Sequence, residues 1–480
     1  MMLETFQRPS RTLCVISCLV VITLLIQSST LNESLKTKKN LQWNLVSATN
    51  STVDGLEDDL PDWIVNYVEW HKSMRAKFPG KKLFTDPSAP KLVIRVCRKS
   101  GGCGGLNDRL GQLGWDLYIA VQTNRLFLIW WESPKLEEFL LPNRIDWSVP
   151  PEGEALLKGE PQRLFQNLRY EWDMRDQAWD SKIETSIKAA INGTTKDEKI
   201  LVHSLTSHAK GSFFEKKLKA SGLAHDIESS PMFGNIFRLF FRPSLPVQEQ
   251  IDRISSTLGL LPGEFTAVHL RVRYPVWVGQ RVDDSADRHG LKWDGDRKQI
   301  AISQALHAFR CSRMLLKQPD EKLYLMADAS KLVNFFANSA QNLTSEDSQY
   351  SSLEPDSLQM IRSLKIVARE DSNENLHIDR DIDRDAKLYY PSFVDLLIAS
   401  KARCVAYGQG RYGLFTAKLG GTACQLWYEK ETAPVIEPGK EHAPFCAKKA
   451  NNTFDIIYPK NIKGETVHGF QQFQNSLQLV

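Results

Sequence analysis

The sequence predicts an α/β protein with two doubly wound, Rossmann-like domains, and three observations lead to this prediction. Apolar runs of strand length alternate with helical stretches over residues 91–205 and again from about residue 264. A stretch at 242–262 with no strand pattern separates the two series. The 480-residue chain is long enough for two cores. Strands alternating with such helices form parallel sheets covered on both faces, and we expect ligands in a cleft between the two domains.

The elements follow in order along each series. In the first domain, assigned to 89–255, strands are expected at 91–97, 125–131 and 199–205, and helices at 106–122 and 133–140. In the second domain, assigned to 256–447, strands are expected at 265–272, 322–328, 363–369, 403–407 and 424–428. Helices between them are expected at 297–315, 330–340, 391–400 and 411–419, and 448–480 is assigned to a tail.

Composition excludes one broad class of function. The chain is 42% hydrophobic and 25% charged, with a formal net charge of +4. A general nucleic-acid binder would carry a larger and more clustered basic charge, so no nucleic-acid partner is expected.

The amino terminus predicts a membrane anchor. Residues 13–26 form an uninterrupted uncharged run behind Arg8 and Arg11, and no small-residue cleavage site follows it. We assign 1–12 to a cytoplasmic tail, 13–27 to a signal-anchor helix and 28–88 to a luminal stem, whose amphipathic patch at 62–78 is a helix that can dock on the body. The short span suits a type II protein of the Golgi membrane. A cleaved signal, with an endoplasmic-reticulum or secreted protein, is the alternative.

Sequons and cysteines support a luminal body. The triplet N-x-[ST] occurs at Asn32, Asn50, Asn192, Asn342 and Asn451, although chance also produces a few in a chain of this length. Six cysteines lie outside the apolar run and permit up to three disulfides, with the pairing open. None has zinc-ligand spacing, and Cys311 is expected to be a buried thiol on a helix.

The stretch CVAYGQGRYGLFTAKLGG at 404–421 contains the spacing G-x-G-x-x-G between a strand and a helix. In a dehydrogenase this fingerprint follows the first strand of the nucleotide domain, with an acid such as Glu429 about 20 residues on. Here the chain ends about 70 residues after Gly413, so the glycines belong to a late βα unit. Glycines before a helix still suit a phosphate, and tight packing without a ligand is the alternative.

Two further motifs favour an anion ligand. Four glycines crowd the turn at 101–105, before Asn107 and a helix. The strand AVHLRVR places His269, Arg271 and Arg273 on one face by its two-residue period. Arginines at the carboxyl end of a buried strand are costly unless they meet anions, and Arg suits bidentate phosphate contact. An arginine ladder on an exposed edge strand is the alternative.

The segments GGLNDRL, VHLRVR and FVDLLIASKARCVAYGQGRYGLFTAKLGG together resemble the GDP-fucose-dependent fucosyltransferase superfamily, which includes α1,6-, plant α1,2- and protein O-fucosyltransferases. The resemblance extends patchily over about 91–430. It implies a GT-B fold, an inverting mechanism and no obligatory metal or cofactor, with GDP-fucose as the donor substrate. The implied partners are this nucleotide sugar and a glycan or glycoprotein acceptor.

The resemblance also implies roles for single residues. His269 and Asp395 match guanine contacts, and Arg271 matches the arginine at the β-phosphate of the leaving GDP. Gly105 and Asn107 match a loop over the pyrophosphate. Gly410 and Arg411 stand where several members have Ser or Thr, a departure that weakens the donor assignment. Arg273, beside Arg271 on the strand, completes the predicted nucleotide-sugar site.

The acceptor hydroxyl also needs a base. Asp284, which we assign as catalytic with Arg271, is one candidate, and Asp283 and Asp108 are others; all three are equally explained as solvated loop charges. The motif Asp294-x-Asp296 is a metal pattern in other glycosyltransferases, but no buried strand precedes it, so a helix start is expected. Residues 379–385 lack the glycine and glutamate of a calcium loop.

Three functions remain open from the sequence: a fucosyltransferase of the secretory pathway, a glycosyltransferase with another nucleotide sugar, and a non-catalytic luminal binding protein. The paired arginines disfavour the third. Trp147, Trp172 and Trp179 can be read as an acceptor wall or as core residues.

Overall fold

The structure is a computed structural model, and it describes residues 60–99, 103–158, 169–172, 199–204, 230–272, 295–339, 355–370, 375–378, 384–408, 410–428, 446–450 and 453–457. All of them belong to one compact unit, Leu56–Val480. The predicted anchor at 13–27, the five sequons, and Arg273, Asp283 and Asp284 lie outside the described residues. Among the helices that are described, none combines the length and the apolar character needed to span a bilayer.

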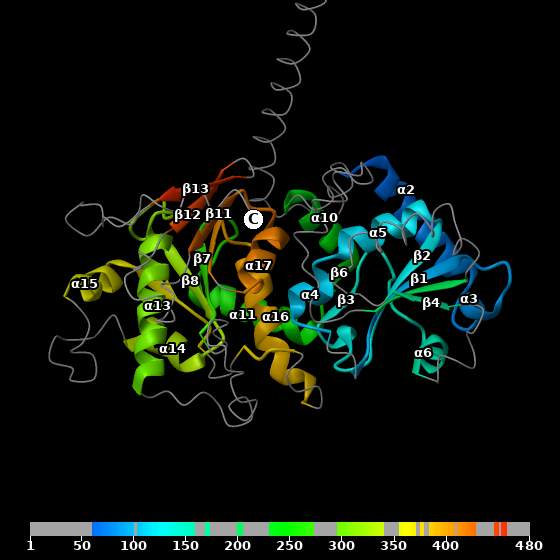
Figure 1. Cartoon of the computed structure of the whole chain (residues 1–480), viewed down its shortest axis with the longest axis horizontal. Coiled ribbons are helices and arrows are strands. Elements are labelled where there is room, and N and C mark those ends of the chain that lie inside the picture. The colour runs from blue at the N-terminus through cyan, green and yellow to red at the C-terminus, as the bar shows by residue number, and fades with distance from the viewer. Residues whose placement is uncertain are drawn as a thin grey trace, which may run out of the picture. The chain divides into compact units, whose positions relative to one another are not determined.

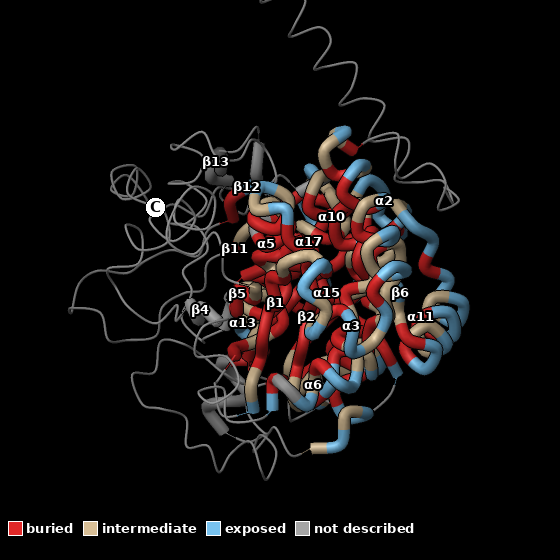
Figure 2. The backbone as a smooth tube through the Cα atoms, turned by 90° about the vertical axis from the view of Figure 1, so that its right-hand side faces the viewer, coloured by how far each residue is buried: buried red, intermediate tan, exposed pale blue. Residues whose placement is uncertain are grey.

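The first sheet is parallel and has the strand order β2-β1-β5-β4 (Figure 1). Its strands are β1 (Lys91–Cys97), β2 (Arg125–Trp131), β4 (Arg169–Trp172) and β5 (Ile200–Ser204). Successive residues of β1 enter different cores: Val93 packs with the cluster around α2 and α5, whereas Leu92 and Ile94 pack with the cluster around α3. Both faces are therefore covered, which explains why the strand is largely apolar. The tube in Figure 2 is accordingly red along β1 and β2.

The amphipathic patch after the predicted stem forms α2 (Asp62–Lys77), and it docks on this sheet. Its buried residues include Ile64, Tyr67 and His71. The Tyr67 hydroxyl donates to Arg125 O (3.0 Å) and accepts from Phe127 N–H (2.9 Å), so the strand and helix satisfy each other's polar groups. Burial lowers the pKa of His71 to about 4, because the charged imidazolium would lose its water.

The second sheet has seven strands in the order β13-β12-β11-β10-β7-β8-β9. They are β7 (Thr266–Leu270), β8 (Lys322–Ala327), β9 (Lys365–Val367), β10 (Cys404–Tyr407), β11 (Cys424–Tyr428), β12 (Cys446–Ala450) and β13 (Thr453–Ile457). β7 to β11 are parallel, and β12 and β13 extend the sheet in antiparallel fashion. The alternation pattern does not predict these last two strands, which include residues assigned to the tail.

Numbered along the chain, the five parallel strands stand in the order third, second, first, fourth, fifth. This is the doubly wound order, and its switch point lies between the first and fourth strands, here β7 and β10. Ligands of such sheets bind outside the carboxyl ends of the strands at that point. The residues after Leu270 and after Tyr407 therefore mark the first place to look for a site.

The remaining elements cover these sheets. The helices are α3 (Lys82–Thr85), α4 (Leu106–Leu110), α5 (Leu113–Gln122), α6 (Pro151–Lys158), α10 (Ser230–Phe240), α11 (Leu245–Leu258), α13 (Gly295–Arg313), α14 (Ser330–Asn334), α15 (Pro355–Ser363), α16 (Tyr390–Ala399) and α17 (Tyr412–Gly420). One buried cluster contains residues of both sheets. Within it, α10 packs on α17 and on α5, with the Phe233 and Phe237 rings against Phe415.

The helix expected at 133–140 is wrong. Leu136–Glu138 form one 3₁₀ turn, and β3 (Leu140–Pro142) pairs with β6 (Phe241–Pro243) about a hundred residues further along the chain. A pairing over this separation overrides local helix propensity and leaves no local signal.

The six cysteines form three disulfides: Cys97–Cys103, Cys311–Cys446 and Cys404–Cys424. The expectation of a free Cys311 thiol is therefore wrong, since its partner comes from β12. His307 lies beside this bridge, 3.7 Å from Cys311 Sγ, and the three side chains are close enough to hold a metal. A sulfur in a disulfide is not a thiolate, so this group is a bridge rather than a metal centre as it stands.

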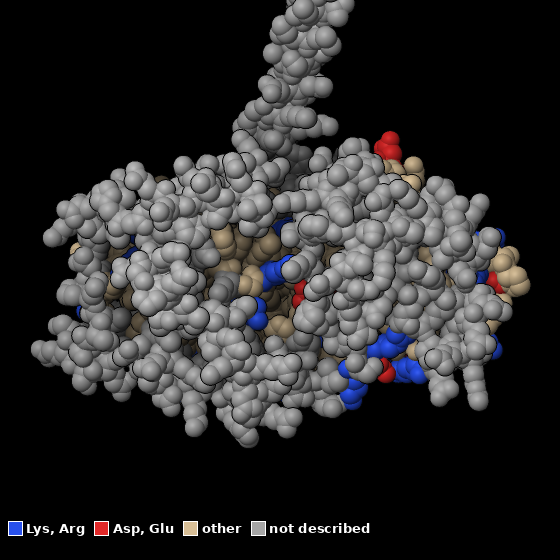
Figure 3. Space-filling model, viewed as in Figure 1, with Lys and Arg blue, Asp and Glu red and all other residues tan. Residues whose placement is uncertain are grey.

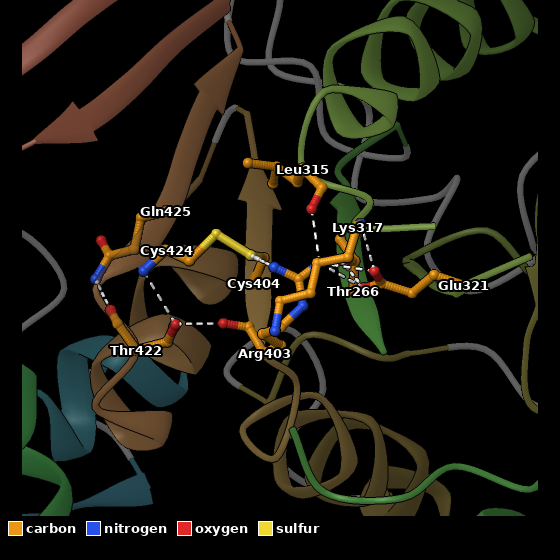
Figure 4. The surroundings of a disulfide bond; sticks show 9 residues. All are labelled: Thr266, Leu315, Lys317, Glu321, Arg403, Cys404, Thr422, Cys424 and Gln425. Carbon is orange, nitrogen blue, oxygen red and sulfur yellow. Dashed lines mark hydrogen bonds and ion pairs between the residues drawn. A yellow bond between two sulfur atoms is a disulfide. The ribbon is translucent and has the colours of Figure 1, made fainter. Parts of the chain in front are cut away.

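The amino ends of β7 and β10 are held by a polar cluster around the third bridge (Figure 4). Arg403 donates to both oxygens of Glu321 (2.7 and 2.8 Å), and Thr266 Oγ1 donates to the same carboxylate (2.7 Å). This cluster fixes the sheet at the edge opposite to the carboxyl ends of its strands.

Candidate nucleotide site at the strand switch point

Arg271 and Gly410 meet at the switch point. Tyr407, the last residue of β10, is in register with His269 on β7, so the segments after both strands start side by side. The Gly410 backbone has φ +84°, and a Cβ at this position would lie 2.9 Å from Arg271 Cδ. Glycine is thus required twice, by the left-handed backbone and by the arginine side chain that crosses it. The structure brings together the two motifs that the sequence places 139 residues apart.

His269 lies behind this contact. Its side chain is buried, and Nδ1 has no hydrogen-bond partner among the described residues. The ring lies 5.1 Å from the Tyr412 ring, and a Cβ on Gly413 would lie 2.9 Å from its Cβ. Burial, aided by the charge of Arg271, lowers the pKa of His269 to about 3, so the imidazole is neutral at physiological pH.

The amino-terminal end of α17 faces the same edge of the sheet. Arg411 is its N-cap residue, and Tyr412 begins its first turn. The first N–H groups of a helix have no partner within the helix and carry partial positive charge, which suits a phosphate. The unpartnered Nδ1 of buried His269 beside Tyr412 is an independent sign that a polar ligand belongs here.

Asp328 is a site residue that the sequence analysis missed. It follows β8, and its Oδ1 accepts from the backbone N–H of Val272 (2.8 Å). This bond fixes the backbone immediately after Arg271. The signal was available, because Asp328 ends the apolar run of β8 at the same sheet edge.

Asp395 lies in a buried network. Its carboxylate accepts from the Tyr324 hydroxyl (2.6 Å), from Arg369 Nε (3.2 Å) and from Asn375 Nδ2 (2.6 Å). Burial and the charge of Asp395 raise the pKa of Tyr324 well above its ordinary value, so the phenol stays a donor. The guanine contact implied by the resemblance stays a prediction. The hydrogen bonds to these three partners give Asp395 a structural role as well, which no motif indicated.

The other predicted glycine turn, which precedes α4, is built around Asp108. Gly104 has φ +75°, and a Cβ there would lie 2.6 Å from Asp108 Oδ2. The same oxygen accepts from the Gly105 N–H (3.1 Å), so Asp108 caps α4. Asn107, half-buried, lies in the first turn of that helix. The Cys97–Cys103 bridge closes the loop before the turn.

Two buried arginines hold this turn against the sheet. Arg109 Nε donates to Gly104 O (2.9 Å), and its guanidinium lies 4.8 Å from the centre of the Trp131 ring. Arg95 forms a fully buried ion pair with Asp116 and donates to Arg109 O (2.8 Å). The turn is therefore held by charge-assisted bonds from β1 and α4 that belong to the protein itself.

Two smaller expectations are settled. Trp147 is a core residue: it is fully buried, and its Nε1–H donates to Phe240 O (2.7 Å). Residue 295 begins α13, which puts Asp296 in the first turn, as expected for a helix start. In the space-filling view, basic and acidic side chains lie together in the middle and at the lower right (Figure 3), in keeping with the small net charge.

This arrangement defines a class: a doubly wound α/β protein with an arginine, a glycine loop and a helix start at the switch point of its sheet. No protein-family profile matches the chain, and no curated protein matches it in sequence. Its structure is similar to a GDP complex of an Arabidopsis thaliana FUT1 mutant, with 12% identity, 80% of this chain and 81% of that chain covered, and a TM-score of 0.48. It is also similar to NodZ α-1,6-fucosyltransferase soaked with GDP-fucose, with 13% identity, 75% of this chain and 100% of that chain covered, and a TM-score of 0.40. A third similar structure is fucosyltransferase NodZ from Bradyrhizobium, with 13% identity, 75% of this chain and 99% of that chain covered, and a TM-score of 0.39.

At this level of similarity, the function has to be argued from the residues of this chain.

Proposed function

We propose that the protein is a glycosyltransferase that transfers fucose from GDP-fucose to a glycan or glycoprotein acceptor. One observation carries the proposal: Arg271 lies across Gly410 at the switch point, beside the start of α17. A guanidinium, a glycine loop and a helix start at one place form a site for a diphosphate.

The chemistry of sugar transfer needs such a group. When the bond between the sugar C1 and the β-phosphate oxygen breaks, negative charge grows on the departing GDP. Arg271 and the N–H groups of α17 stabilise this charge without a metal, and they are positioned before the reaction begins. Attack by the acceptor from the opposite side of the sugar inverts the configuration at C1.

GDP is the proposed nucleotide because of the motif resemblance. In addition, His269, beside Tyr412, has an unpartnered ring nitrogen that can bond to a nucleobase. Arg411 at the position of a hydroxyl residue keeps another nucleotide sugar as the second candidate. In either case Arg271 meets the diphosphate, so the two candidates differ in the base and the sugar only.

The proposed place of action is the Golgi lumen, with residues 13–27 as a type II anchor. The three disulfides support this part of the proposal, because such bridges persist in oxidising compartments. Detection of the protein in a Golgi membrane fraction, with its body protected from added protease, tests it.

The experiment for the site uses the purified protein with GDP, UDP and NAD in a thermal-shift assay, followed by a panel of nucleotide sugars and detection of released nucleotide. We expect stabilisation by GDP and release of GDP from GDP-fucose. Arg271→Ala should lower the release by about 10²–10³-fold with normal folding. Arg253→Ala, which removes an exposed arginine of α11, is the control. An active Arg271→Ala variant, or a shift with NAD alone, refutes the proposal.

A further inference from the structure

A four-residue segment, 375–378, is fastened to the second sheet. Asn375 Nδ2 donates to Asp395 Oδ2 (2.6 Å) and to Ala327 O at the carboxyl end of β8 (3.1 Å). Ser392 Oγ on α16 donates to Leu376 O (3.0 Å). Three bonds thus fix the start of the segment near the edge that carries Arg271.

The other end of the segment contacts the turn that follows β1 of the first sheet. Arg109 Nη2 on α4 donates to Ile378 O (3.3 Å). Since α4 also packs on α17, the segment spans neighbouring helices that begin at the two glycine turns. His377 is the residue between these attachments, and its position is determined from both sides.

His377 lies directly against Gly105. A Cβ on Gly105 would stand 3.1 Å from His377 Nε2 and 3.2 Å from its Cε1. The same point is 3.9 Å from Asp108 Oδ2. Glycine at 105 therefore makes room for an imidazole, and a carboxylate lies close by. The imidazole is half-buried, so it is within reach of a ligand.

We propose that His377 is the general base of the transfer, an inference that rests on the proposed function. Histidine is the side chain that most often takes a proton in catalysis. Arg271, which is proposed to meet the leaving group, contacts Gly410 in the turn after β10. His377 contacts Gly105 in the turn after β1. An inverting displacement needs its base and its leaving group on opposite sides of the sugar. The leaving group is therefore assigned to the turn after β10 and the base to the turn after β1, which the motif resemblance alone assigns to the pyrophosphate.

The step balances without a further reactant. The acceptor oxygen forms a bond to C1 of the sugar while its proton passes to the imidazole of His377. The bond from C1 to the β-phosphate oxygen breaks, and its electron pair leaves with GDP beside Arg271. The imidazolium, near Asp108, then returns the proton to water.

The test uses the full chain and GDP-fucose with water as the acceptor, and it measures released GDP. His377→Gln keeps a polar side chain of similar size but takes no proton, and His377→Ala leaves space for added imidazole. We expect both variants to keep the stabilisation by GDP and to release GDP about 10²–10⁴-fold more slowly. Imidazole in the buffer should restore release in His377→Ala and not in His377→Gln.

Three results would overturn the inference: unchanged release in His377→Gln, loss of GDP stabilisation in that variant, or failure of imidazole to restore His377→Ala. The second result would make His377 a contact of the nucleotide. If the unaltered protein neither binds GDP nor releases it from GDP-fucose, the proposed function fails, and the base assignment fails with it. A variant effect is therefore interpreted only against an active parent.

Discussion

Replacement of Gly410 by alanine tests whether the glycine loop serves Arg271. Two effects are expected. Alanine at φ +84° is strained by about 1–2 kcal/mol, and its methyl group would lie 2.9 Å from Arg271 Cδ, so the guanidinium has to move. Gly263→Ala is the matched control, because Gly263 has φ +77° and lies in the turn before β7, at the opposite edge of the sheet. Both variants are expected to carry the backbone strain, whereas only Gly410→Ala is expected to displace Arg271 as well.

The magnitude follows from binding linkage. At a GDP concentration of 100 times Kd, GDP stabilises the unaltered protein by about 2.7 kcal/mol. Loss of a hydrogen bond between charged groups costs up to about 3 kcal/mol, which weakens GDP binding by up to about 10²-fold. The same GDP concentration would then equal Kd, and the stabilisation falls to about 0.4 kcal/mol. Gly263→Ala should keep the full 2.7 kcal/mol above its own lower baseline.

Denaturant unfolding with and without GDP measures both quantities in one experiment. The baseline without GDP reports the strain, and the difference reports the contact between Arg271 and the nucleotide. Equal GDP stabilisation in the two glycine variants would refute the role of Gly410, since the strain would then be its whole effect.

Two further predictions concern stability. The pKa of His71 is about 4 in the folded protein against 6.5 unfolded, so its stabilising contribution is complete above pH 6.5 and is lost as pH falls toward 4. From pH 7.5 to 5 this amounts to about 2 kcal/mol, and His71→Gln should flatten the pH dependence of the unfolding free energy by that amount; an unchanged slope contradicts the assignment. Removal of the disulfide between Cys311 and Cys446, which closes a loop of 135 residues, should cost about 5 kcal/mol, against about 3 for the 20-residue loop of Cys404 and Cys424. Double alanine variants compared by denaturant unfolding measure the order, and the reverse order would show that strain or packing outweighs chain entropy.

Local patterns predicted the parts of this fold that local physics determines. The strands β1, β2, β7 and β10 are largely apolar because both sheet faces are covered, and the alternation of apolar runs with helical stretches predicts this. The docked α2 follows from its amphipathic pattern. The glycine loop was assigned to a late βα unit, and this is confirmed, because it joins β10, the fourth parallel strand of its sheet, to α17.

Pairings over long distances were not available from the sequence. No local sequence pattern indicates that Cys311 forms a disulfide with Cys446, or that β3 pairs with β6. The contact between Arg271 and Gly410 depends in the same way on strand order, because β10 has to pass β8 and β9 to lie beside β7.

The strand order also explains why the spacing G-x-G-x-x-G follows the fourth parallel strand of this sheet and not the first. In a dehydrogenase, the first strand of the sheet supplies the glycine loop. Here Arg271 directly follows the first strand, β7, and Gly410 lies in the loop after the fourth strand, β10. A long guanidinium and a bulky loop residue cannot share the switch point, so an arginine on one strand requires a glycine on the other. Arginine and glycine thus come from two different strands, and together they form the place at which we propose that the diphosphate binds.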